Sequence, residues 1–215
     1  RFLYSGFVQQ HYDEKESAMR SFKEAEQYGR HAIDSLTVAQ AEFWMGKMLL
    51  DDGREQEALA MLQTAHLNFG NHIVDKALTQ NIKSICYLLQ GDFGKAEICL
   101  HQSLLDAEKS YSRPYKVNCK IWNNRAVLYR IQGKYDQAIN CLYKMLEDSG
   151  LDENGIFMSS LNLGNVFFDM KEMDSAAKYY QHIESVLPSF NVKKETIYYY
   201  EYLETKELKE EEIDK

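Results

Sequence analysis

The chain has 215 residues, a formal net charge of -8 and a hydrophobic content of 45%. This hydrophobic content is enough for a packed core and excludes wholesale disorder. The acidic balance argues against nucleic-acid binding, which needs a basic face. No stretch approaches the ~18 apolar residues of a membrane span, so we expect none in this chain.

Five alanines recur at spacings of 40, 38, 42 and 38 residues, each within a similar run of residue types. They are Ala18, Ala58, Ala96, Ala138 and Ala176. Self-similarity at a nearly fixed period indicates a repeat array. In such an array each unit contacts only its neighbours, and the whole forms one elongated domain.

Each repeat has the pattern of two amphipathic helices joined by a short turn. The chain contains only two prolines and no sustained apolar–polar alternation, which favours an all-helical fold. We predict helix pairs at about 1–30, 35–69, 71–109, 114–148 and 154–188. The turns within four of these pairs are predicted at 51–53, 90–92, 132–134 and 170–172. Lys171 stands where the other turns have glycine, so we expect that turn to be more strained or differently shaped.

The two ends of the chain carry further expectations. Residues 1–6 have the pattern of the middle of a helix, which suggests a piece of a longer protein. Residues 189–215 are predicted to form a final helix that either caps the array or links it to another domain. Its apolar half includes Tyr198–Tyr202, and homodimer formation through this segment is a third hypothesis beside the two functions below.

The best repeat resembles the tetratricopeptide repeat (TPR). It matches through an ordered series of large, small, aromatic and glycine positions, namely Trp122, Ala126, Tyr129, Gly133, Tyr135 and Ala138. A second copy matches through Leu163, Gly164, Phe167, Ala176 and Pro188. The resemblance implies a right-handed α-α superhelical solenoid of about five helix pairs plus a C-terminal helix. The long units are similar to those of kinesin light chain and of bacterial TPR sensors and regulators.

The resemblance also implies a concave groove lined by the first helix of each pair. The family's inward positions correspond to Phe43, Lys47, Asn81, Lys120, Asn123, Asn124, Val127, Arg130, Leu161, Asn162, Asn165 and Phe168. The asparagines among them carry both a donor and an acceptor, so they could pair with the backbone of a bound peptide. The alternative is that these amides join adjacent helices or meet solvent.

Two functions follow from this resemblance. The first is a non-catalytic interaction module that binds a peptide or helical segment of a partner protein in the groove. The second is a sensor domain of a larger bacterial regulator, in which ligand binding changes the superhelix and moves an attached output domain.

No catalytic, metal or cofactor motif is visible. The six histidines and four cysteines are scattered without the spacing of a metal site, and no glycine-rich phosphate loop occurs. We therefore expect no enzyme activity, no metal and no cofactor. We expect the cysteines to be small buried groups, which favours a reducing compartment such as the cytoplasm.

Overall fold

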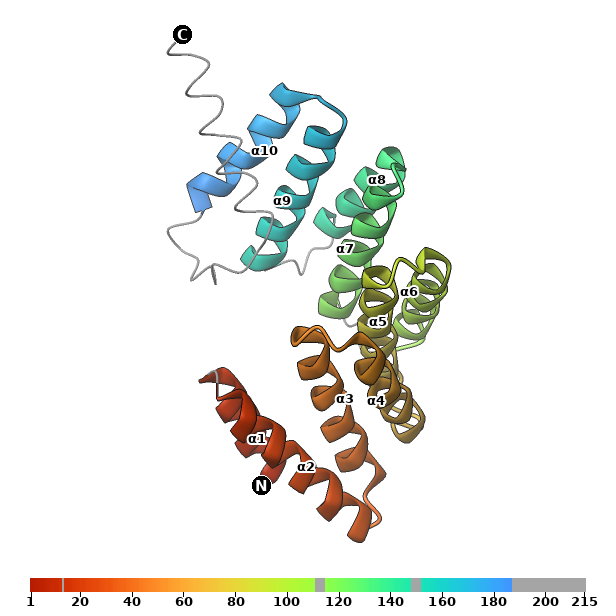
Figure 1. The fold of residues 1–215 in the computed structure, drawn as a ribbon. Coiled ribbons are helices and arrows are strands. Elements are labelled where there is room, and N and C mark those ends of the chain that lie inside the picture. The colour runs from red at the N-terminus through yellow and green to blue at the C-terminus, as the bar shows by residue number, and fades with distance from the viewer. Residues whose placement is uncertain (13, 111–114, 148–151, 187–215) are drawn as a thin grey trace. The chain divides into compact units, whose positions relative to one another are not determined.

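The computed structural model describes residues 1–12, 14–110, 115–147 and 152–186 (Figure 1). Within these ranges the chain forms ten α-helices and no strand, which confirms the predicted all-helical fold. The helices are α1 (Phe2–His11), α2 (Lys15–His31), α3 (Ser35–Asp51), α4 (Glu55–Asn68), α5 (Ile73–Leu89), α6 (Phe93–Glu108), α7 (Tyr115–Ile131), α8 (Tyr135–Leu146), α9 (Glu153–Asp169) and α10 (Met173–Val186). The predicted helix at 189–215 lies outside the described residues, and so does the segment proposed for self-association.

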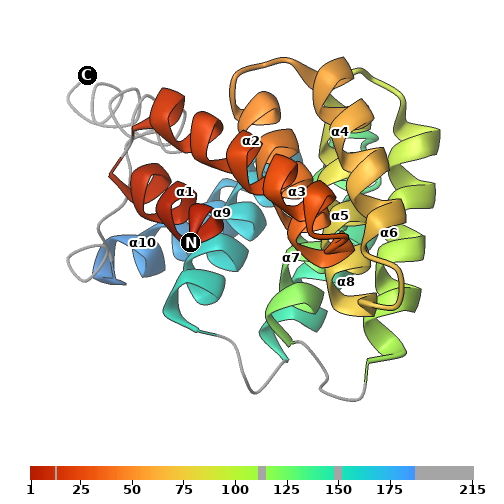
Figure 2. The same cartoon turned by 90° about the horizontal axis from the view of Figure 1, so that it is seen from below.

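The contacts divide the chain into two compact units, Arg1–Asn124 and Arg125–Lys215. In the first unit α1 and α2 lie at one end, and the hairpins α3–α4 and α5–α6 follow (Figures 1 and 2). In the second unit α9 packs against both α8 and α10. The boundary falls within α7, so α1 to α6 belong to the first unit and α8 to α10 to the second.

A contact between a small and a large residue recurs within the helix pairs. A small residue of the first helix faces a large residue of the second helix sixteen positions later. The contacts are Gly6 with Phe22, Gly46 with Leu62 and Gly164 with Tyr180. A Cβ atom added at Gly46 would lie only 2.8 Å from Cγ of Leu62, so the two helix axes approach as closely as they do because position 46 has no side chain.

The recurrent alanines are buried at the same helix pairings. Four of the five have no exposed surface and Ala176 is 3% exposed. Each is the fourth residue of the second helix of its pair. The alanine period in the sequence therefore marks a buried position near the start of each second helix, where a small side chain is packed.

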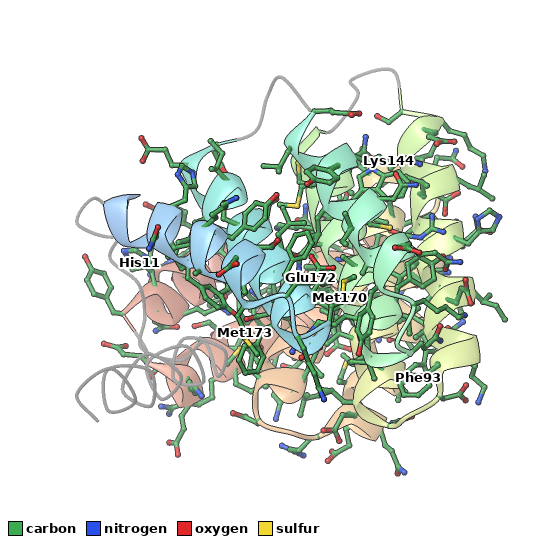
Figure 3. All side chains as sticks on the ribbon, turned by 90° about the horizontal axis from the view of Figure 1, so that it is seen from above. His11, Phe93, Lys144, Met170, Glu172 and Met173 are labelled. Carbon is green, nitrogen blue, oxygen red and sulfur yellow. The ribbon has the colours of Figure 1, made fainter. Side chains whose placement is uncertain are left out.

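Four turns within the pairs, those at Gly53, Gly91, Gly133 and Lys171, share one backbone conformation. Gly133 has a φ of 70°, in the left-handed region that glycine adopts without strain. Lys171 has a φ of 62°, so the glycine-free turn has the same left-handed conformation, with the strain in the Lys171 backbone. Its neighbours in the sequence, Met170, Glu172 and Met173, are labelled in Figure 3.

Candidate functional site

The first helices of the pairs in the first unit lie side by side. Helix α3 contacts both α1 and α5 directly. Gly46 of α3 faces α4, and at 100° per residue Phe43 and Lys47 lie on an adjoining face of the same helix. We call the face formed by Phe7, Phe43, Trp44, Lys47, Asn81 and Ile85, with Lys120, Asn123 and Asn124 from the middle of α7, the first-helix wall.

Aromatic rings form a continuous series at the α1 end of this wall. The ring of Trp44 lies 5.2 Å from that of Phe7 and 5.5 Å from that of Phe43, both in edge-on geometry. Phe7 in turn contacts the buried ring of Phe22, 5.5 Å away. Phe7 is 37% exposed, and Phe43 and Trp44 are half-buried, so part of each ring is accessible from the wall.

Lys47 places a positive charge on this aromatic surface. Its Nζ lies 5.2 Å from the centroid of the Trp44 ring, a cation–π geometry. The side chain is half-buried. Among the described residues no carboxylate forms an ion pair with it. The wall therefore presents an ammonium group whose partner is an indole ring.

The predicted asparagines at the other end of the wall are joined to each other. Asn81 of α5 is 2% exposed, and its Oδ1 accepts a hydrogen bond of 3.1 Å from Nδ2 of Asn124 in α7. Asn123 donates to Asn124 at 3.4 Å. The Asn81–Asn124 pair thus joins two first helices, which is the alternative role considered for these amides. Lys120 is exposed and Asn123 is half-buried.

Most of the predicted positions in the second unit are also engaged. Arg130 forms a two-pronged ion pair with Asp169, with contacts of 2.6 and 3.3 Å that join α7 to α9. Asn165 is 4% exposed and accepts a hydrogen bond of 2.8 Å from the hydroxyl of Tyr180. Leu161 is 2% exposed in the core between α9 and α10.

Three further predicted residues lie in the second unit. Asn162 is 4% exposed, whereas Val127 and Phe168 are half-buried. Phe168 packs against the α9–α10 core. Val127 and Phe168 are thus the accessible apolar members of the predicted set in this unit.

Trp44 was not among the predicted site residues, although it lies between two that were. The available signal was the repeat register, because residue 44 lies 80 and 118 residues before the predicted Asn124 and Asn162, as Ala58 lies before Ala138 and Ala176. Carrying that position back into α3 would have found Trp44.

The described part of the chain shows no arrangement typical of metal or nucleophilic chemistry. It holds no cluster of three metal-ligating side chains. All four cysteines are buried, and none of them is in a disulfide bond. Burial raises the pKa of Cys86 to about 12 and also raises the pKa of Cys99 and of Cys141. In the described ranges, no helix has the length and apolar character that crossing a membrane requires.

Comparisons with known proteins agree with this architecture. The family model of the tetratricopeptide repeat matches residues 119–147. No protein of curated function matches the sequence. Among solved structures, BtubC (BKLC) from P. vanneervenii has a TM-score of 0.70 at 15% identity, over 87% of this chain and 80% of that chain.

Two other solved structures have the same fold. A candidate kinesin light chain of Podosopora anserina with nearly identical TPR-like repeats has a TM-score of 0.62 at 12% identity, over 89% of this chain and 96% of that one. The MamA protein has a TM-score of 0.55 at 14% identity, over 89% and 94%. Proteins built from this repeat generally serve as non-catalytic scaffolds for protein–protein interaction. Residues 119–147 are therefore a tetratricopeptide repeat, and the chain has the all-helical solenoid fold of TPR proteins.

Proposed function

We propose that this chain is a protein-interaction module that binds an apolar segment of a partner protein against the first-helix wall. The observation that carries this proposal is the series of accessible aromatic rings at Phe7, Trp44 and Phe43. Aromatic side chains dominate the energy of protein interfaces because they bury much area and lose little entropy. A helical or extended segment with two or three apolar anchors suits such a row.

The charges of the wall favour a segment that also carries an acidic residue. The chain as a whole is acidic, with 33 Asp and Glu against 25 Lys and Arg. None of the residues that define the wall is a carboxylate, whereas two, Lys47 and Lys120, are cations. A carboxylate beside an apolar anchor would pair with Lys47 at the Trp44 ring. The net charge of -8 disfavours the approach of the same carboxylate to the chain elsewhere.

The predicted residues of the second unit enter the proposal in two groups. Val127 and Phe168 are proposed as apolar contacts of the second unit considered by itself, because both are half-buried. Arg130, Leu161, Asn162 and Asn165 are proposed to act by holding the helices, in keeping with their ion pair, hydrogen bond or burial. Asn81 and Asn124 take the same supporting role in the first unit.

The test is selection of a displayed random-peptide library on the whole chain. We expect the selected peptides to share apolar residues next to Asp or Glu. The best of them is then synthesised and titrated into the Trp122→Phe variant, in which Trp44 is the remaining tryptophan and its fluorescence reports on the wall. Lys47→Glu should weaken binding about tenfold, because it replaces a charge-assisted contact by repulsion.

Lys23→Glu is the matched control, since Lys23 is exposed on α2 and has the same charge change. It should leave the affinity unchanged. A library that yields no binder, or a binder that ignores Lys47→Glu and leaves Trp44 fluorescence unaltered, rejects the proposal. Small-angle scattering at saturation then separates a scaffold from the ligand-responsive sensor, because only the sensor changes its radius of gyration.

A further inference from the structure

A buried lysine of α5 has no counter-ion. Lys83 is 8% exposed, and its Nζ donates a hydrogen bond of 2.6 Å to Oε1 of Gln63 in α4. This acceptor is neutral, and no carboxylate in the described ranges forms an ion pair with Lys83. Buried lysines are normally paired with an anion, because removing an ammonium group from water is costly. The contact with Gln63 therefore leaves a positive charge that lacks a negative partner.

Packing does not require a charged residue at this position of the repeat. Lys83 lies thirteen residues before a recurrent alanine, and Met45 of α3 and Leu163 of α9 lie at the same place in their own repeats. Met45 is 1% exposed and Leu163 has no exposed surface. An apolar side chain thus fills this position in two other helix pairs. The ammonium group of Lys83 is therefore explained by something other than the core.

A second lysine and a histidine lie close to Lys83. Lys76 precedes it by seven residues, which is nearly two turns along the same face of α5. Burial lowers the pKa of His66 in α4, the charges of Lys76 and Lys83 lower this pKa further, and Asp106 opposes them. Nδ1 of His66 is buried and has no hydrogen-bond partner within the described part of the chain. We call Lys76, Lys83 and His66 the α4–α5 cluster.

The polar groups around the α4–α5 cluster leave it positively charged. Lys76 donates to the carbonyl oxygen of Gly70 at 3.3 Å, which is another neutral acceptor. Asp106 of α6 is the nearby carboxylate, but its Oδ1 already accepts hydrogen bonds from Gln102 at 3.0 Å and from Lys109 at 3.2 Å. The charge of Lys109 thus offsets that of Asp106, and the two lysines of the cluster remain without an anion.

We propose that the α4–α5 cluster binds a doubly charged oxyanion of the phosphate class, either free phosphate or a phosphorylated side chain of a partner protein. Two ammonium groups match its two negative charges, and lysine binds phosphate as a point charge. In its Nδ1–H form, His66 donates to a phosphate oxygen. Gln63 is exposed, so its amide turns to solvent when the oxyanion takes its place at Lys83. The cluster is distinct from the first-helix wall, because Lys83 is rotated by about 200° from Asn81 along α5.

The test follows the imidazole of His66 by nuclear magnetic resonance while sodium phosphate is added to the whole chain at constant ionic strength. We expect one histidine resonance, assigned with His66→Gln, to shift saturably. Its pKa should rise, because a bound anion stabilises the imidazolium form. Lys83→Met should weaken phosphate binding about tenfold, since it removes one of two charge-assisted contacts. This variant should fold, because Met45 is buried at the equivalent position.

Lys23→Met is the matched control, since Lys23 is exposed on α2 and the charge change is the same. It should leave the affinity for phosphate unchanged, whereas Lys76→Met should weaken binding as Lys83→Met does. Circular dichroism shows whether each variant is folded. The absence of a saturable His66 shift overturns the proposal. Equal effects of Lys23→Met and Lys83→Met also overturn it, because they would show a general response to charge.

An alanine peptide with a central phosphoserine distinguishes the two sources of the anion. The same peptide with unmodified serine is its control and should not shift the His66 resonance. Tighter binding of the phosphopeptide than of free phosphate assigns the site to a phosphorylated partner. Equal or weaker binding of the phosphopeptide assigns it to the free anion. If the unmodified peptide binds as well as the phosphopeptide, the cluster does not recognise an oxyanion and the proposal is rejected.

Discussion

Gly164→Ala tests the close contact between first and second helices at its tightest point. A Cβ atom at residue 164 would lie 2.7 Å from Cδ1 of Tyr180, well inside contact distance. The ring cannot simply rotate away, because its hydroxyl donates a hydrogen bond of 2.8 Å to Asn165. Overpacking costs about 1–3 kcal/mol. Losing the hydrogen bond costs about 1 kcal/mol, and alanine recovers about 1 kcal/mol of helix propensity. We therefore expect a net loss of about 1–3 kcal/mol.

A double-mutant cycle with Tyr180→Leu identifies the cause. Ala126 and Leu142 already occupy the same two repeat positions in the preceding helices, and both are buried. The combination Gly164→Ala/Tyr180→Leu copies this natural solution, so it should recover at least about 1 kcal/mol relative to the sum of the single changes. Urea unfolding followed by circular dichroism measures all four corners of the cycle.

Gly94→Ala is the control for the glycine itself. A Cβ atom there meets only Asp92 Oδ1, at 3.8 Å, so the substitution should be neutral or stabilising by up to about 1 kcal/mol. If Gly164→Ala and Gly94→Ala have equal effects on the urea midpoint, the close-contact explanation is wrong. An additive cycle would equally show that the added methyl group does not act through the Tyr180 ring.

Three further predictions concern backbone strain, pH and thiols. Ile33→Gly and Lys171→Gly should each raise the free energy of unfolding by about 1 kcal/mol in urea titrations, since these residues have φ of 57° and 62°. Burial raises the pKa of Glu42 despite its ion pair with Arg30, so its contribution to stability is complete at low pH and is lost as pH rises above roughly 4.3. In urea titrations, the free energy of unfolding of the Glu42→Gln variant should therefore rise relative to that of the parent chain as pH increases. Ellman's reagent should detect four thiols in denaturant and none within minutes in the native chain, because all four are buried.

The helical framework could be predicted because it depends on residues whose role is local to each pair. Ala138 lies near a helix start, where a small side chain is buried. Gly133 lies in a turn, where it adopts the left-handed conformation that a larger side chain disfavours. The Lys171 turn shows the limit of this reasoning. The absence of glycine predicted strain or a different shape, and the structure shows the left-handed conformation retained by a lysine. The packing of α9 on α10 outweighs a local preference worth only about 1–2 kcal/mol.

The candidate site was less predictable because it depends on how adjacent helices are offset. The sequence places Asn81 and Asn124 on successive first helices, but it does not say whether their amides meet each other or a ligand. The 3.1 Å hydrogen bond between them forms only when α5 and α7 are offset along their axes so that the two side chains meet. The same holds for Leu161, whose repeat position is inward in the family but whose side chain lies in the α9–α10 core. Periodicity gives the side of the helix on which a residue lies, to within about one residue position. Whether the side chain is buried depends on smaller offsets between neighbouring helices.

We propose that pair packing and partner binding depend on different residues of α3, Gly46 and Lys47, and this separation can be tested at a single turn of the helix. Gly46 faces Leu62, and its lack of a side chain lets the two helices of the pair approach closely. Lys47, the next residue, is rotated by about 100°, and its Nζ lies over the ring of Trp44 in the same helix. Lys47→Glu should therefore change the free energy of unfolding by less than about 0.5 kcal/mol, whereas Gly46→Leu should prevent the pair from closing. If Lys47→Glu unfolds the chain as readily as Gly46→Leu, the wall is part of the core. Its aromatic rings would then be explained by packing, without any bound partner.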